Sequence, residues 1–205
     1  MVGNPKGVNE EKILHEESIL YHDMVQGDFT DEYELVTYKI LASMYWVSTR
    51  CPHVPWVIRA DDDILVDPFL LNKTLHKTAK EGLNCNIWSH YKVHREGKRA
   101  IPKQQYSETY FPPFCTGAFV FHHHQLLYRL LQASCSTPLM MWMEDVYIFG
   151  VLVQQVGGIQ ENLKVMIHRH RGDRINVKGL GKVTSWVEIK NRTFWWEKIN
   201  IYHNL

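Results

Sequence analysis

Three consecutive aspartates, Asp61, Asp62 and Asp63, interrupt an apolar stretch of the chain. Trp56-Val57-Ile58 lies before them and Ile64-Leu65-Val66 lies after them, and apolar runs of this length are typical of buried strands. We therefore expect a strand that stops, exposes its acids at the edge of a sheet, and then resumes.

The residues alone leave two interpretations of these acids open. Three adjacent carboxylates repel one another and lose hydration unless a cation offsets them, and hard oxygen ligands suit Mg²⁺ or Mn²⁺. A divalent ion there would in turn hold a diphosphate. The alternative is a solvated acidic turn between two strands. The apolar flanks favour the metal site, because a surface turn does not need them.

Composition limits the class of protein. With 205 residues, 45% of them hydrophobic, the chain is long enough for one domain with a large core. Its formal net charge of +1 gives no overall field that would attract nucleic acid or a membrane surface. We expect the chemistry to be local, and we expect no nucleic-acid partner.

The cysteines and two glycosylation sequons favour the secretory pathway. The sequons are Asn72-Lys73-Thr74 and Asn191-Arg192-Thr193. Four separated cysteines without a C-x-x-C motif allow two disulfides, in any of three pairings. No signal peptide or long apolar run is present in the sequence. The cysteines are Cys51, Cys85, Cys115 and Cys135.

Periodicity predicts the elements of the first half of the chain. A short helix is expected at 10–15, an edge strand at 22–29 and an amphipathic helix at 31–49. After the acidic strand, Asp67 followed by proline is a helix cap, so a helix is expected at 68–80.

The second half continues this alternation. Strands are expected at 86–91 and 118–121, and helices at 126–134 and 144–156. The basic loop 92–110 is interpreted as solvated rather than phosphate-binding. Alternating helices and strands predict an α/β domain with a mostly parallel central sheet flanked by helices, in which ligands bind at the carboxyl ends of strands.

Three adjacent histidines, at 122–124, invite a metal interpretation. Because neighbouring side chains point in different directions, we expect a helix N-terminus with solvated histidines instead. Side chains alternate between the two faces of a strand, so His168 and His170 share one face of the strand predicted there. One of them is a candidate metal ligand. An exposed basic strand is the alternative.

Glu144 and Asp145 begin the helix predicted at 144–156. Acids at a helix N-terminus complement the macrodipole, which is one sufficient explanation. A carboxylate fixed there, beside an apolar wall and in the same sheet as a metal site, also meets the requirements of a general base that deprotonates a hydroxyl.

Four ordered motifs resemble the inverting β-1,3-glycosyltransferases of family 31, over about residues 16 to 170. The quoted segments are Asp28-Phe29-x-Asp31-x-Tyr33, Arg59-Ala60-Asp61-Asp62-Asp63, Tyr110-Phe111-Pro112-Pro113-Phe114-Cys115-x-Gly117, and Glu144-Asp145-Val146-Tyr147-x-x-Gly150. Each alone is a weak signal, and their order and spacing make the resemblance specific.

The resemblance implies a glycosyltransferase A-type fold and a UDP-sugar donor held through Mn²⁺. It assigns Asp63 and His168 as metal ligands, with His170 as the alternative to His168. Asp145 is then the catalytic base.

Under the same resemblance Asp61 and Asp62 contact the nucleotide and sugar, and Glu144 and Gly117 belong to the substrate site. The implied reaction moves galactose, or less favoured N-acetylglucosamine, to a glycan acceptor in β-1,3 linkage for protein or lipid glycosylation.

Members of that family are typically type II membrane proteins of the Golgi, with a strand upstream of the segment that begins here at Glu16. We therefore expect an N-terminally truncated single catalytic domain that lacks this strand and the anchor. The rival hypothesis is a non-catalytic glycosyltransferase-like scaffold or folding partner in the secretory pathway. A metal-dependent phosphohydrolase does not explain the motifs at 110–117 and 144–150.

Overall fold

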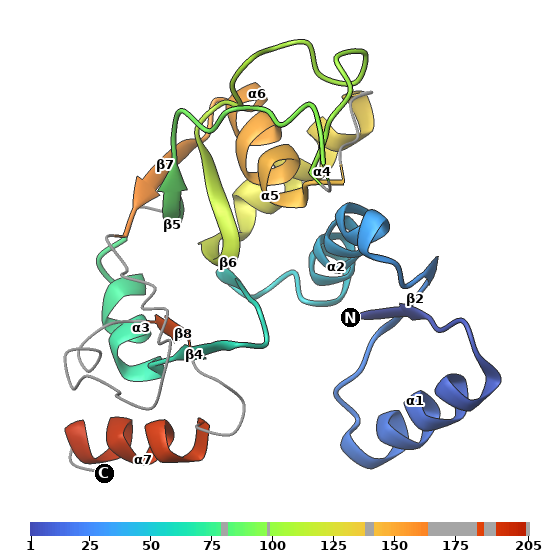
Figure 1. Ribbon diagram of the computed structural model, residues 1–205. Coiled ribbons are helices and arrows are strands. Elements are labelled where there is room, and N and C mark those ends of the chain that lie inside the picture. Colours follow the sequence, from blue (N-terminus) through green and yellow to red (C-terminus); the bar gives the residue numbers. More distant parts are fainter. Residues whose placement is uncertain (79–81, 98, 138–141, 164–183, 187–191, 204–205) are drawn as a thin grey trace.

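The structure, a computed structural model, is a mixed α/β arrangement with a central sheet and flanking helices (Figure 1). This confirms the expected fold class. The residues that it describes are 1–78, 82–97, 99–137, 142–163, 184–186 and 192–203.

The central sheet has four strands in the order β3-β6-β5-β7. β3 (Trp56–Ala60) and β5 (Gly82–Trp88) both pair antiparallel with β6 (Phe114–His123), and β5 pairs parallel with β7 (Ile159–Asn162). The expectation of a mostly parallel sheet is therefore wrong for the described strands. The reason lies in the connection: a loop, not a crossover helix, joins β5 to β6, and parallel neighbours need such a crossover.

The register between β5 and β6 shifts in the middle of the pair. Cys85 is opposite Val120, whereas Ile87 is opposite Cys115, so β6 has more residues than β5 over this interval. An irregularity of this kind bends a strand and redirects its side chains. Gly117 and Ala118 lie within this irregular part of β6.

Helices pack against the sheet through their apolar faces. α2 (Val36–Arg50), preceded by the 3-10 turn η1 (Tyr33–Leu35), covers the helix predicted at 31–49. α4 (His124–Ser136) follows β6 directly and buries Leu126, Leu127 and Leu130, three residues at helical spacing. α2 and α4 lie beside each other, and the Tyr128 hydroxyl donates to the Ser48 carbonyl at 2.9 Å.

The helix predicted at 144–156 is present as three consecutive helical segments. They are α5 (Glu144–Val146), the π-helical η2 (Tyr147–Leu152) and α6 (Val153–Gln155). Wider π turns inside α-helices are frequent at functional sites. Gly150 allows η2 to approach β6, because a Cβ at this position would lie 2.8 Å from the Phe114 Cβ.

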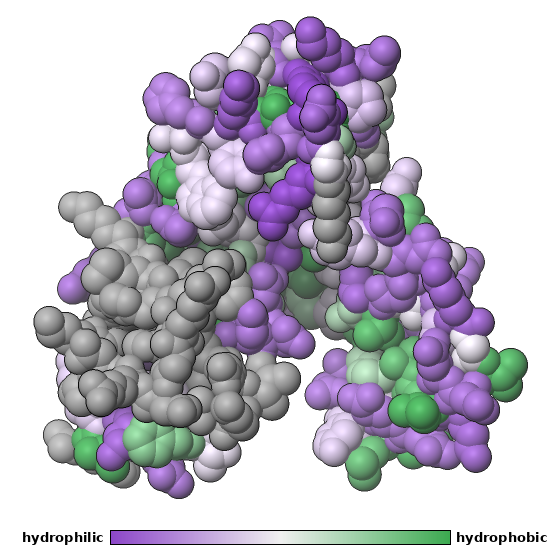
Figure 2. Space-filling model, in the orientation of Figure 1, coloured by the Kyte–Doolittle hydropathy of each residue, from purple (hydrophilic) through white to green (hydrophobic). Residues whose placement is uncertain are grey.

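The N-terminal segment forms a small parallel pair, β1 (Val2–Asn4) with β2 (Gln26–Thr30), connected by α1 (Val8–Tyr21). α1 is longer than the helix expected at 10–15. It buries none of its residues, and Val8, Ile13 and Leu20 are exposed. Apolar groups are visible in this part of the surface in Figure 2.

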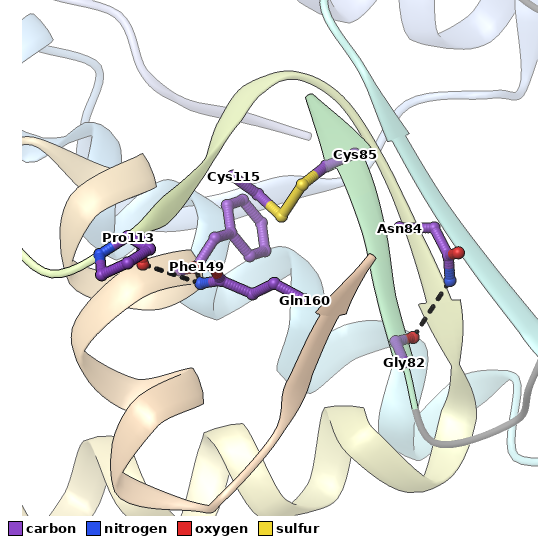
Figure 3. The surroundings of a disulfide bond; sticks show 7 residues. All are labelled: Gly82, Asn84, Cys85, Pro113, Cys115, Phe149 and Gln160. Atoms are coloured by element: carbon purple, nitrogen blue, oxygen red, sulfur yellow. Dashed lines mark hydrogen bonds between the residues drawn. A yellow bond between two sulfur atoms is a disulfide. The ribbon is translucent and has the colours of Figure 1, made fainter. Parts of the chain in front are cut away.

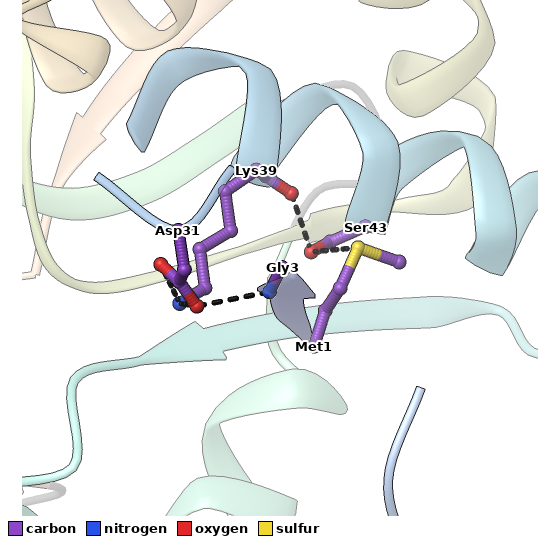
Figure 4. A network of polar contacts seen from close by, with 5 residues as sticks. All are labelled: Met1, Gly3, Asp31, Lys39 and Ser43. Carbon is purple, nitrogen blue, oxygen red and sulfur yellow. Dashed lines mark hydrogen bonds and ion pairs between the residues drawn. The ribbon is translucent and has the colours of Figure 1, made fainter. Parts of the chain in front are cut away.

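Asp31 connects this N-terminal pair to α2 (Figure 4). Its carboxylate accepts hydrogen bonds from the Gly3 backbone N–H at 2.9 Å and from Lys39 Nζ at 2.9 and 3.0 Å. Burial acts to raise the pKa of Asp31, but these hydrogen bonds and the charge of Lys39 outweigh it, so the pKa is lowered. Asp31, one of the motif residues, thus has a structural role.

A second group of elements lies beside the central sheet. β4 (Ile64–Val66) pairs antiparallel with β8 (Thr184–Trp186), and α3 (Pro68–Leu75) and α7 (Arg192–Tyr202) accompany them. As predicted, Asp67 caps α3: its Oδ1 accepts from the Phe69 and Leu70 backbone N–H groups, each at 3.0 Å. His203 Nε2 lies 2.9 Å from Asp67 Oδ2.

One disulfide, Cys85–Cys115, joins β5 to β6 across a sequence separation of 30 residues (Figure 3). Both cysteines are fully buried. Cys51 and Cys135 are free thiols, so of the two disulfides allowed by the sequence only one forms. Beside it, the Gln160 amide donates to the carbonyls of Pro113 at 2.8 Å and Phe149 at 2.7 Å, which ties β7 to both segments.

None of the described helices has the length and hydropathy needed to cross a bilayer.

Candidate active site

The ends of β3 and β5 lie on either side of the first half of β6. The end of β3 lies beside the middle of β6, where the Asp61 N–H donates to the Ala118 carbonyl at 2.9 Å. The end of β5 lies on the other side of β6, where Trp88 is opposite Phe114. A pocket of ≈ 560 Å³ opens here. Its lining residues are Tyr33, Asp61, Asn86, Trp88, Tyr91, Arg99, Phe114, Thr116, Gly117, Ala118, Trp142, Met143, Glu144 and Asp145.

The three aspartates form the tight turn between β3 and β4, closed by a hydrogen bond of 3.1 Å from the Ile64 N–H to the Asp61 carbonyl. The strand therefore stops and resumes as predicted, although β4 continues in a different sheet. Asp61 lines the pocket, whereas Asp62 is exposed and belongs to the solvated part of the turn. Asp63 is half-buried and does not line the pocket.

Arg59, on β3, connects the two acidic parts of the site. Its Nη2 lies 3.1 Å from Asp61 Oδ1 and 3.1 Å from Glu144 Oε1. Charge-assisted contacts of this kind are stronger than those between neutral groups. The guanidinium therefore holds the turn after β3 against the start of α5, which is 83 residues further along the chain when measured from Asp61 to Glu144.

Gly117 provides the space for that guanidinium. A Cβ at this position would lie 2.1 Å from Arg59 Nη1 and 2.9 Å from Arg59 Cζ. Gly117 lines the pocket, and its assignment to the substrate site stays a prediction. The structure adds a reason for the glycine that the sequence did not reveal, namely the close approach of Arg59.

Burial sets the protonation behaviour of the pocket carboxylates. It raises the pKa of Asp61, Glu144 and Asp145, and the Arg59 charge opposes the increase in all three. Asp145 also raises the pKa of Glu144.

Asp145 is held at the start of α5 by its backbone surroundings. The Val146 N–H donates to Asp145 Oδ1 at 2.8 Å. Hydrogen bonds from the Val146, Asp145 and Gly117 backbone lower the pKa of Asp145, but less than burial raises it. A fixed carboxylate whose pKa lies above its ordinary value is a better proton acceptor than an exposed one.

An aromatic wall, defined as Tyr33, Trp88, Tyr91, Phe114 and Trp142, lines the rest of the pocket. Tyr33 and Phe114 belong to the quoted motifs, but no sequence pattern predicted Trp88, Tyr91 or Trp142 as site residues. For these three the 12% aromatic content was the only signal, and it does not separate core residues from ligand-binding ones.

The loop 92–110, expected to be solvated, is organised from within by Arg95. Its guanidinium donates to four backbone carbonyls, those of Ile101, Tyr106, Ser107 and Glu108, at distances from 2.5 to 3.4 Å. Arg95 therefore stabilises the loop that follows Tyr91. Arg99, from the same loop, is exposed and lines the pocket.

The described residues do not by themselves complete a metal site. No group of three or more His, Cys, Asp or Glu side chains with metal-binding geometry occurs in the described part of the chain. His168 and His170 lie outside the described residues, so the pairing of either with Asp63 stays a prediction. Asp63 Oδ1 is buried and has no hydrogen-bond partner among the described residues.

The histidines at 122–124 give a correction. The predicted helix N-terminus is confirmed, because α4 begins at His124, and the His123 side chain caps it. His122 and His124 are buried rather than solvated, because β6 continues through His123 into the core. Burial lowers the pKa of His122 to about 4, so it is neutral at ordinary pH.

Comparison with known proteins places these features in context. A family model described as galactosyltransferase matches residues 1–164. The rat protein named lactosylceramide 1,3-N-acetyl-beta-D-glucosaminyltransferase is 29% identical over 165 residues, which are 77% of this chain and 43% of that protein.

Two further relatives are named beta-1,3-galactosyltransferases. Human beta-1,3-galactosyltransferase 2 is 30% identical over 146 residues, which are 67% of this chain and 34% of that protein. Mouse beta-1,3-galactosyltransferase 1 is 28% identical over 153 residues, which are 71% of this chain and 46% of that protein. The chain thus spans less than half the length of these curated relatives.

Proposed function

The chain belongs to the galactosyltransferase family, and from that membership and its pocket we propose that it is an inverting hexosyltransferase. The proposed reaction moves galactose, or as the second choice N-acetylglucosamine, from a UDP-sugar to a glycan hydroxyl in β-1,3 linkage. The names of the relatives, which include 1,3-linked transferases of both sugars, support this choice.

One observation carries the proposal. Asp61 and Asp145 are far apart in sequence, yet both line the same pocket, and Arg59 and Gly117 lie between them. A transferase of this kind needs a donor subsite and a base for the acceptor hydroxyl within reach of each other. The pocket supplies an acidic turn on one side and a buried carboxylate on the other.

Asp145 is the proposed base. Its raised pKa increases its affinity for the proton of the acceptor hydroxyl, and its backbone hydrogen bond from Val146 fixes its orientation. The hydroxyl oxygen then attacks the anomeric carbon of the donor from the face opposite the diphosphate. The proton moves to Asp145, and the bond to the diphosphate breaks with inversion at that carbon.

Glu144 and Asp61 have supporting roles in this proposal. Each accepts a contact from Arg59 Nη2, so the guanidinium fixes the acidic turn relative to Asp145. Asp61 and Asp62 are placed on the donor side, where they meet the nucleotide and the sugar.

Mn²⁺ is the proposed cofactor, and the donor set fits it. Carboxylate oxygens are suitable ligands for a hard divalent cation, and Asp63 Oδ1 is a buried oxygen without a partner among the described residues. Asp63, together with His168 or His170, would hold the ion. When bound, it would neutralise charge on the leaving diphosphate.

The Golgi lumen is the proposed location, with membrane attachment through an N-terminal anchor in the full-length protein. The buried Cys85–Cys115 disulfide supports an oxidising compartment, because cytosolic proteins rarely keep such bonds. Glycan acceptors on glycoproteins or glycolipids are the proposed partners, and no nucleic acid is among them.

Calorimetry with UDP, with and without Mn²⁺, tests the proposal together with a transfer assay. We expect binding that depends on the metal, and transfer of sugar from UDP-galactose or UDP-N-acetylglucosamine to a β-galactoside. Absence of both metal-linked UDP binding and transfer would support the non-catalytic scaffold instead.

A further inference from the structure

Trp88 presents an open aromatic face inside the pocket, and it has no role in the chemistry described above. It is the last residue of β5, and 44% of its surface is exposed although it lines a pocket. Exposure of a large indole ring costs free energy unless something covers it.

The backbone after β5 fixes one side of this ring. The chain turns at His90, whose φ of 56° lies in the left-handed region, an uncommon conformation for a residue with a side chain. Tyr91 then lies against Trp88, with ring centroids 5.4 Å apart and planes inclined by 31°. The indole is thus packed against Tyr91 and, at 6.2 Å between ring centroids, against Phe114, and part of its exposed surface lines the pocket.

Tyr91 is itself held rigidly. Its ring lies nearly parallel to that of Phe111 and meets the edge of Phe114, and its carbonyl accepts from the Phe111 N–H at 3.0 Å. Its hydroxyl is 3.3 Å from His94 Nε2. A platform supported in this way loses little side-chain entropy when a ligand binds, so contact energy contributes more fully to affinity.

We propose that Trp88, supported by Tyr91, is a stacking platform for the galactopyranose ring of a β-galactoside acceptor; this inference rests on the proposed function. In galactose the axial O4 leaves the C3–H, C4–H and C5–H bonds on the opposite face of the ring. These polarised hydrogens pack against the negative face of an indole. The hydroxyls at the ring edge remain available to the polar lining, which includes Asn86, Glu144 and Asp145.

The strand order places the platform on the acceptor side. The donor diphosphate belongs at the acidic turn after β3, and β6 separates β3 from β5 in the sheet. Trp88 at the end of β5 therefore lies on the other side of β6 from Asp61. Asp145 lines the same pocket, so a sugar on Trp88 shares the cavity with the proposed base.

Saturation-transfer NMR with methyl β-D-galactopyranoside tests the platform directly. In the unchanged protein we expect the strongest saturation at the ring protons H3, H4 and H5. Trp88→Ala should weaken binding roughly 2- to 10-fold, the range that aromatic contacts typically contribute. Trp88→Phe keeps an aromatic face and should retain most of the affinity, whereas Trp88→Leu keeps apolar volume without that face and should lose it.

Trp196→Ala is the matched control, because Trp196 on α7 is 42% exposed and does not line the pocket. It should leave galactoside binding unchanged. Cooperative thermal unfolding near the temperature of the unchanged protein shows that each variant is folded. If Trp88→Ala or Trp88→Leu binds the galactoside as well as the unchanged protein does, Trp88 is not a stacking platform. Equal or stronger Trp88-dependent binding of methyl β-N-acetylglucosaminide would overturn the choice of galactose.

These outcomes are separable from those of the proposed function. Galactoside binding that depends on Trp88, without transfer from any UDP-sugar, refutes the enzyme activity and leaves the platform in place. Transfer to a galactoside with unchanged acceptor KM in Trp88→Leu refutes the platform and leaves the enzyme activity in place.

Discussion

Arg59 Nη2 lies 3.1 Å from Glu144 Oε1, and the same nitrogen lies 3.1 Å from Asp61 Oδ1. One guanidinium thereby joins the acidic turn after β3 to the start of α5. Both sides of this contact are largely buried: the side chains of Arg59 and Glu144 are 21% and 19% exposed. The arrangement of the pocket depends on this contact.

Replacement of Arg59 should change the pH dependence of activity. The Arg59 charge lowers the pKa of Glu144 and of Asp145, so Arg59→Ala removes an effect that favours their ionised forms. A base must be deprotonated to act, and the acidic limb of the pH–rate profile should therefore move to higher pH. Arg59→Lys keeps the charge and should restore part of the shift. An unchanged acidic limb in Arg59→Ala would contradict this role.

Asp145→Asn should separate binding from transfer. The amide keeps the shape of the side chain but does not accept the acceptor proton, so transfer should fall roughly 10²- to 10⁴-fold. UDP binding by calorimetry should stay close to that of the unchanged protein. Glu197→Gln, an exposed change on α7, is the control. Transfer at an unchanged rate in Asp145→Asn would exclude Asp145 as the base.

Asp63→Ala should abolish the dependence of UDP binding on Mn²⁺. The buried Asp63 Oδ1 without a described partner is the atom expected to meet the ion. Glu197→Gln, an exposed change on α7 away from the pocket, serves as the comparison. Calorimetric titrations of UDP at several Mn²⁺ concentrations measure the effect. Metal-linked binding that survives in Asp63→Ala would refute the ligand assignment.

Gly117→Ala should destabilise the protein through contact with Arg59. The added Cβ would lie 2.1 Å from Arg59 Nη1, and overpacking of this kind costs about 1–3 kcal/mol. Urea unfolding measures the loss. In the double variant with Arg59→Ala the cost of the added methyl should largely disappear, because the colliding group is gone. Additive losses in the double variant would show that another contact is responsible.

Loss of the Cys85–Cys115 disulfide should lower stability by about 3–4 kcal/mol, as expected from the entropy of a loop of 30 residues. Thermal unfolding of Cys85→Ala with Cys115→Ala, compared with Cys51→Ala with Cys135→Ala, measures this difference. The second pair removes two free thiols and should have a much smaller effect. Equal losses in the two double variants would contradict a stabilising role for the disulfide.

Local sequence patterns predicted most helices and strands. The Asp67 cap places the start of α3, and the leucines of α4 mark its buried face. The helix at 68–80 was predicted too long, since α3 ends at Leu75, and the strand at 86–91 was placed too late, since β5 begins at Gly82. The residue at which a helix or strand ends depends on tertiary contacts more than its formation does.

The sequence by itself determined which acidic groups the site contains. The acids at 61–63 and 144–145, and Gly117, stand out because charged residues and a glycine interrupt apolar patterns that local physics explains. Asp61, Gly117, Glu144 and Asp145 do line one pocket.

The tertiary structure alone decided how those groups meet. The antiparallel pairing of β6, the approach of Arg59 to Gly117 and the support of Trp88 by Tyr91 join residues that no local pattern relates. Hydrophobic periodicity reports which side of an element is buried, but it carries no information about the partner element or its direction. Only the packed sheet turned separate motifs into a single cavity.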